Sequence, residues 1–102
     1  MPATFEFDAE LWEWSARQDS WVFVTVPQHI SDEIDDLIPN PAGFGSVKVA
    51  VRVGSTEWST SLFPDASSGT FVLPIKKAVR TAESLDAGDV SSIWIEVVHA
   101  AQ

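Results

Sequence analysis

Residues 46–53, SVKVAVRV, form the most regular stretch of the sequence, because every second residue is a valine. The four valines share one side of an extended chain, and the other side carries Ser46, Lys48, Ala50 and Arg52. Strict alternation of this kind is typical of a β-strand with one face in the core and one in water. The stretch therefore predicts a half-buried strand near the middle of the chain.

The residues after this strand predict a β-meander. Gly54-Ser55-Thr56 is a tight turn into a second strand over residues 57–62, which indicates a hairpin. A longer loop follows at residues 64–69, which include Pro64, Asp65 and Gly69, and it leads into a strand over residues 70–73.

The first third of the chain predicts two further strands and a helix. Residues 4–11 alternate apolar and acidic side chains, and residues 21–26 are rich in β-branched and aromatic side chains. We expect residues 15–20 to form the polar turn between these strands. Ser31 has the side chain of an N-cap, and it predicts a short helix over residues 31–38.

The last third predicts a second helix and a closing strand. Pro74 is placed where a helix begins, and apolar residues then recur at helical spacing as far as Leu85. Gly88 follows as a helix-ending residue, and residues 90–98 are rich in Ile and Val.

The order strand, proline, helix, glycine, strand occurs twice, once around Pro27 and Gly45 and once around Pro74 and Gly88. Two such units indicate an internal repeat with pseudo-twofold symmetry. An open sheet would leave two exposed edges, whereas interleaved units can close and hide them. We therefore predict a mostly β fold over residues 1–102: one domain, a closed six-stranded barrel with two short helices.

Composition limits the function. The 102 residues carry 15 Asp and Glu against 6 Lys and Arg, a formal net charge of −9, and contain no cysteine. The charge argues against nucleic acid as a partner, and the absence of cysteine excludes thiolate chemistry and cysteine-held metal sites. No apolar run approaches the roughly 20 residues of a membrane-spanning helix. We expect a cytoplasmic protein without a membrane partner and without a cofactor.

Several motifs resemble a known family. Trp58-x-x-Ser61-Leu62-x-Pro64, then LPIKKAVR at residues 73–80, then Gly88-Asp89 are similar to the bacterial domain of unknown function catalogued as nineteen-oh-five. The resemblance implies a double-split β-barrel that is distantly similar to AbrB and MazE type regulators. In those regulators two chains build the barrel, whereas here one chain would contain both halves. It implies no agreed activity.

Basic side chains crowd the start of the second helix, where the helix dipole disfavours cations by about 0.3–1 kcal/mol each. Such a departure from a local rule often marks a functional place. We predict an anion-binding site there, formed by backbone N–H groups and by the basic residues, with a tryptophan and two hydroxyl groups from the preceding hairpin at its edge. Its six residues are Trp58, Thr60, Ser61, Lys76, Lys77 and Arg80. The alternative is that these bases pair with acids of the first helix, such as Asp35 and Asp36, and bind nothing.

Catalysis is not predicted. His29, Ser31 and Asp32 have the residue types of a triad, but sequence neighbours at a strand–helix junction seldom converge on one point. The acids of the first helix are interpreted as solvated charge, and no metal site is predicted.

The chain has five tryptophans, of which Trp12 and Trp14 share the register of the acidic face of the first strand. We expect the tryptophans to plug the barrel ends and pack under the helices. The alternative is an exposed ligand groove or partner surface.

The sequence thus predicts a non-enzymatic binding or interaction module, as a monomer or homodimer, whose partner is a small anionic ligand or a protein. The alternatives are an AbrB/MazE-like regulator that contacts DNA or a protein, and an enzyme of unknown reaction.

Overall fold

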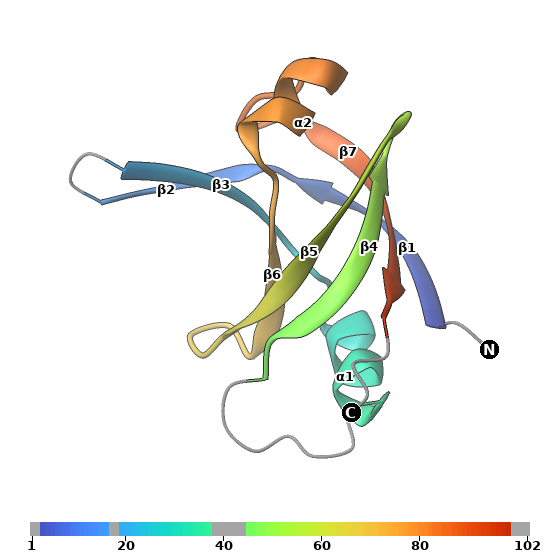
Figure 1. Cartoon of the computed structure of the whole chain (residues 1–102). Coiled ribbons are helices and arrows are strands. Elements are labelled where there is room, and N and C mark those ends of the chain that lie inside the picture. The colour runs from blue at the N-terminus through green and yellow to red at the C-terminus, as the bar shows by residue number, and fades with distance from the viewer. Residues whose placement is uncertain (1–2, 17–18, 38–44, 99–102) are drawn as a thin grey trace.

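The computed structural model describes residues 3–16, 19–37 and 45–98, which form seven strands and two helices (Figure 1). In chain order the elements are β1 (Ala3–Glu10), β2 (Trp12–Ala16), β3 (Asp19–Thr25), α1 (Gln28–Leu37), β4 (Val47–Val53), β5 (Thr56–Asp65), β6 (Thr70–Pro74), α2 (Lys77–Glu83) and β7 (Val90–Val97). The strands form one antiparallel sheet in the order β1-β7-β4-β5-β6-β3-β2. The predicted mostly β class with two helices is confirmed.

The prediction of a closed barrel of six strands is wrong, because the sheet is an open half-barrel of seven strands. The difference arises at Leu11, where the first long strand changes partner: β1 pairs with β7, whereas β2 pairs with β3. Leu11 itself is bonded to the chain before β7, since its N–H donates to the carbonyl of Asp89 and its carbonyl accepts from the N–H of Gly88. Among the described residues no ladder joins β1 to β3, so the sheet stays open there.

The two predicted units are visible in the strand pairing. We call β1, β2, β3, α1 and β4 the first unit, and β5, β6, α2 and β7 the second unit. In the second unit β5 also changes partner: it pairs with β4 as far as Leu62 and with β6 from Phe63 onward. Leu62 therefore corresponds to Leu11, and both side chains are fully buried. The last strands of the units, β4 and β7, pair with each other, and so do β3 and β6.

The core consists of the inward-facing side chains of the strands together with one side of each helix. β4 shows the predicted alternation, with its four valines buried and Lys48 and Arg52 exposed. The two helices lie at opposite ends of the sheet, α1 at the bottom and α2 at the top of Figure 1. Ile30 and Ile34 bury the inner side of α1, and Val79 buries that of α2.

Ser31 is not the N-cap that the sequence predicted, because α1 begins three residues earlier, directly after Pro27. Ser31 is buried inside the helix, where its hydroxyl donates to the carbonyl of Val26 at 3.2 Å and accepts from the N–H of Phe71 at 3.1 Å. One hydroxyl thus links the first helix to the strand end before it and to β6. The predicted last residue of this helix, Ile38, lies outside the described residues.

Three predicted boundaries also differ. The predicted turn at residues 15–20 is shorter than expected, because β2 continues to Ala16 and β3 begins at Asp19. This hairpin projects beyond the rest of the sheet, so its tip can be polar (Figure 1). Pro64 and Asp65 extend β5 rather than opening the loop. Pro74 ends β6 rather than beginning the second helix, which starts at Lys77 and is confined to seven residues.

Candidate functional site

The predicted basic residues lie at the start of α2, and they differ in exposure. Lys76 directly precedes the helix and Lys77 is its first residue, and both are exposed. Arg80 is partly buried, and its Nε donates to the carbonyl of Ile75 at 3.1 Å. The guanidinium therefore already holds the chain segment that enters the helix.

The three predicted partners on β5 do not share a face. Trp58 and Thr60 lie opposite the buried Val51 and Val49, so they are on the inner side of the sheet. Ser61 is next in the strand and is on the outer side. The grouping of these three residues with the lysines in one anion site stays a prediction.

The alternative prediction, that α2 pairs with the acids of α1, is wrong. Asp35 and Asp36 are exposed on a helix at the far end of the sheet from Lys77 and Arg80 (Figure 1). Within residues 3–16, 19–37 and 45–98, the ion pair observed is between Arg52 and Glu57 of the central hairpin. The physical reason is the repeat itself, which places its two helices at opposite ends.

His29, Ser31 and Asp32 do not form a triad. His29 is exposed, whereas Ser31 is buried and uses its hydroxyl on backbone groups. Asp32 accepts a hydrogen bond from the side chain of Gln28 at 3.0 Å. Among the described residues, no group of three His, Asp or Glu side chains is placed to hold a metal ion.

The β2–β3 hairpin carries an aromatic surface that the sequence analysis did not select as its site. Trp12 lies opposite Phe23 and Trp14 lies opposite Trp21, so all four rings are on one side of the hairpin. The rings of Trp12 and Phe23 are 5.2 Å apart, and those of Trp21 and Phe23 are stacked at 6.3 Å. Trp14 is 50% exposed and Trp21 is 52% exposed. We call these four residues the aromatic face.

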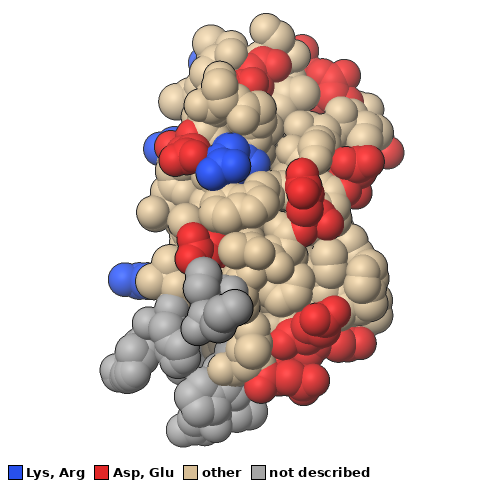
Figure 2. Space-filling model, turned by 90° about the vertical axis from the view of Figure 1, so that its right-hand side faces the viewer, with Lys and Arg blue, Asp and Glu red and all other residues tan. Residues whose placement is uncertain are grey.

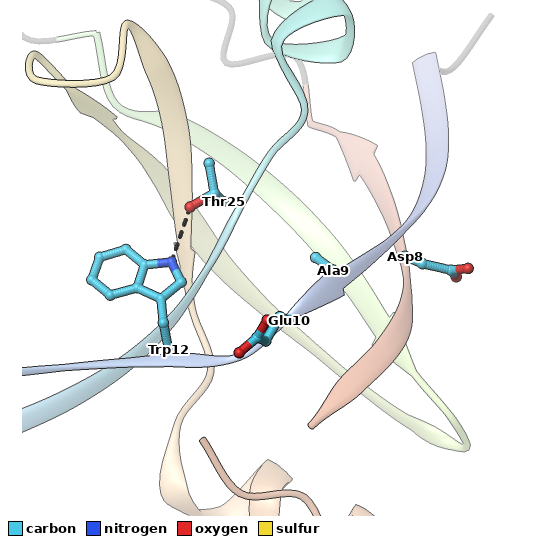
Figure 3. Close-up of a pocket in the computed structure, with 5 residues that line it drawn as sticks. All are labelled: Asp8, Ala9, Glu10, Trp12 and Thr25. Atoms are coloured by element: carbon cyan, nitrogen blue, oxygen red, sulfur yellow. Dashed lines mark hydrogen bonds between the residues drawn. The ribbon is translucent and has the colours of Figure 1, made fainter. Parts of the chain in front are cut away.

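A groove adjoins the aromatic face at Trp12, on the open side of the half-barrel. It has a volume of about 380 Å³ and is lined by Asp8, Ala9, Glu10, Trp12 and Thr25 (Figure 3). The indole Nε1 of Trp12 donates to Oγ1 of Thr25 at 2.9 Å, which fixes the ring beside β3. The groove exists because the chain changes partner at Leu11: β2 pairs with β3, whereas β1 pairs with β7 and is not hydrogen-bonded to β3. We call it the open-edge groove.

A family model described as Domain of unknown function (DUF1905) matches residues 7–95. The chain belongs to this family. The predicted resemblance is thereby confirmed, and the matched range includes the aromatic face and all five residues of the groove lining. No curated protein matches the chain.

Carboxylates dominate the part of this DUF1905 domain that surrounds the groove. The sequences of β1, β2 and β3 contain five Asp and Glu and no Lys or Arg. Glu6, Asp8 and Glu10 are exposed on the outer side of β1, where they alternate with inward-facing residues. Figure 2 shows many acidic and few basic side chains on the face it presents. A cation near the groove therefore meets a negative surface.

The preferred interpretation of the tryptophans as packed side chains is wrong for Trp14 and Trp21 of the DUF1905 domain, which are half exposed. The signal was present in the sequence, because Trp12 and Trp14 continue the alternation of the acids on the first strand. What the sequence did not show is that the hairpin projects from the sheet, so that nothing described in the chain covers it.

None of the helices in the described part of the domain is long and apolar enough to cross a membrane.

Proposed function

We propose that this DUF1905 domain is a non-catalytic binding module that contacts a protein partner through the aromatic face. The observation that carries the proposal is the facing pair of half-exposed indoles, Trp14 and Trp21, on a projecting hairpin. Large aromatic side chains are enriched at protein interfaces and in binding hot spots, where they bury much surface at a small cost in conformational entropy. Exposed in the free protein, these rings forgo roughly 1.5–3 kcal/mol each of burial free energy that a partner can supply.

The side-chain chemistry supports binding rather than catalysis. The hydroxyl of Ser31 is committed to backbone groups, and His29 has no described hydroxyl or carboxylate partner. A general base and a nucleophile need hydrogen-bond contact with each other.

The test uses the chain itself as an affinity matrix. Wild type, a Trp14→Ser/Trp21→Ser double variant and a Phe63→Ser variant are immobilised and exposed to an extract of the source cells. Phe63 is the matched control, because it is an aromatic residue that is 46% exposed where β5 begins to pair with β6. A protein retained by wild type and by Phe63→Ser but lost from the double variant supports the proposal. Equal retention on all three contradicts it.

An anion-accepting surface at the start of α2 is a second candidate. Its support is the exposure of Lys76 and Lys77. The test is the melting temperature of wild type and of a Lys76→Ala/Lys77→Ala variant with phosphates and carboxylates. Stabilisation of wild type alone supports the surface, and no stabilisation of either protein rejects it.

A DNA-contacting regulator of the AbrB or MazE type is less favoured, because the formal charge of −9 opposes binding to a polyanion. Submicromolar, sequence-selective binding of duplex DNA at about 150 mM salt would reverse this ranking.

A further inference from the structure

The outer side of the first long strand changes chemistry at Leu11. Before Leu11 it carries the carboxylates of Glu6, Asp8 and Glu10, and after Leu11 it carries the indoles of Trp12 and Trp14. The open-edge groove lies across this change: Asp8, Glu10 and Trp12 all line it, with Glu10 next to Trp12 and the Asp8 side chain directed away from the ring (Figure 3). A carboxylate beside an aromatic ring is the pair of groups that binds a guanidinium, the acid by charge and the ring by its π face.

The protein already contains one arginine held in this way. The guanidinium carbon of Arg52 lies 4.6 Å from the centre of the Trp94 ring, and its Nε donates to the carboxylate of Glu57 at 2.8 Å. Both partners come from strands adjacent to β4. Side chains on neighbouring strands of this sheet are therefore spaced so that an arginine can contact a ring and a carboxylate together.

The groove offers a ring and carboxylates but no internal cation. Asp8 and Glu10 form no ion pair within the described residues, and β1, β2 and β3 contain no Lys or Arg. A guanidinium bound there would come from outside the described residues.

The backbone around the groove favours an extended ligand. β1 and β2 are the two ends of the strand order, so each has one edge without a described strand partner. Such edges accept an added strand through main-chain hydrogen bonds. Alternate side chains of an added strand repeat at about 6.5–7 Å, the same spacing that separates Asp8 from Glu10 along β1.

We propose that the open-edge groove and the aromatic face bind an extended segment of a partner protein that carries arginine at alternate positions. The arginines contact Asp8, Glu10 and the Trp12 ring, and the apolar parts of the segment pack on Trp14 and Trp21. This inference rests on the proposed function and adds the chemistry of the partner. A second copy of the chain does not fit, because each copy has a formal charge of −9 and brings the same carboxylates to the contact.

The probe is a short peptide in which arginine alternates with threonine, and its control is the same peptide with citrulline, which keeps the shape and removes the charge. Binding is measured by titration calorimetry, and NMR signals of the indole N–H groups locate it. We expect wild type to bind the arginine peptide, to shift the Trp12 and Trp14 signals, and to bind more weakly as salt increases.

The variants separate the two kinds of contact. Asp8→Asn/Glu10→Gln is expected to weaken binding about tenfold, and Trp12→Leu by a similar factor. The matched control is Ser59→Ala/Ser61→Ala on the outer side of β5, which is expected to change nothing. All these side chains are at least partly exposed, and thermal melting shows that each variant is folded.

The inference is overturned if the citrulline peptide binds as tightly as the arginine peptide, or if the acid variant binds like wild type. It is also overturned if free arginine binds as tightly as the peptide, because the site then recognises a small cation. If the extract experiment finds a partner that depends on Trp14 and Trp21 while the arginine peptide fails to bind, the proposed function stands and only the partner chemistry is wrong.

Discussion

The two units of the sheet have the same strand pairing, but the side chains on their outer surfaces differ in charge. Around Leu11 in the first unit, the outer side carries Asp8, Glu10 and Trp12. The corresponding outer positions around Leu62 in the second unit are neutral: Ser59, Ser61 and Phe63. The leucine at the partner change is fully buried in both. The comparison teaches that the shared strand pairing requires a buried leucine in both units, whereas the outward residues are free to differ and give each unit its own surface.

The largest expected effect tests whether Leu11 and Leu62, the residues at which a strand changes partner, contribute equally to stability. Leu11→Ala and Leu62→Ala each remove a fully buried side chain and should each lower the free energy of unfolding by about 2–5 kcal/mol. Urea denaturation measures both. Val90→Ala, at a position that is 65% exposed, is the control and should cost less than about 0.5 kcal/mol. A large cost at only one leucine would break the comparison.

The anchors of the two helices are expected to differ next. Ser31→Ala leaves the buried N–H of Phe71 without its acceptor and should cost about 1–3 kcal/mol. In the second unit Glu83 anchors α2 by accepting from the hydroxyls of Ser55 and Thr56 at a more exposed site. Thermal unfolding of Ser31→Ala and Glu83→Ala should show the smaller loss for Glu83, and the reverse order would contradict this account.

The turn under α2 allows a sharper test of that second anchor. Gly54 has a φ of +59°, and a Cβ there would collide with the carboxylate of Glu83. Gly54→Ala should cost about 1–2 kcal/mol from the backbone conformation alone, plus the cost of displacing Glu83. Gly69 has a φ of +73° but open space around it, so Gly69→Ala reports the backbone cost by itself. Denaturation of the two variants should rank Gly54→Ala as the more costly, and equal losses would show that Glu83 moves freely.

The smallest effect concerns the loop between β5 and β6. Hydrogen bonds from the hydroxyl and N–H of Ser67, and from the hydroxyl of Ser68, lower the pKa of Asp65. A carboxyl whose pKa is lower in the folded state contributes stability above its unfolded pKa of about 3.9, and that contribution is lost as the pH falls through the folded value. NMR titration should give a depressed pKa that moves upward in Ser67→Ala. An unchanged pKa in that variant would show that the serine does not stabilise the charge.

The sequence predicted the inward side of the fold better than its outline. The valines of β4 could be predicted because burial imposes a pattern of period two. The first helix follows Pro27 directly, whereas Pro74 ends β6 and α2 begins only at Lys77. The partner change at Leu11 could not be predicted. The apolar residues do shift there from odd to even positions, at Trp12 and Trp14, but such a shift does not say which strand each segment pairs with. The start of α1 was misplaced because the sequence does not distinguish a serine that caps a helix from a serine that is buried inside one.

The candidate site shows the same limit. The basic residues of α2 were found by their position at a helix start, but the register that places Ser61 on the other face from Trp58 appears only in the structure. The tryptophans of β2 were noticed, but an alternating indole has the same pattern whether a core or a partner covers it.

The pairing of Ala3 with Val97 has a consequence for biosynthesis. Among the described strands, β1 is synthesised first and its partner β7 last. At about 5–20 residues per second, β1 waits roughly 4–20 s without its native neighbour. During that interval its edges are open to the strands of other nascent chains, and Glu6, Asp8 and Glu10 place negative charge along the length of that strand. Charged side chains on an unpaired strand suppress aggregation. The acids of β1 therefore lie where their charge opposes such pairing.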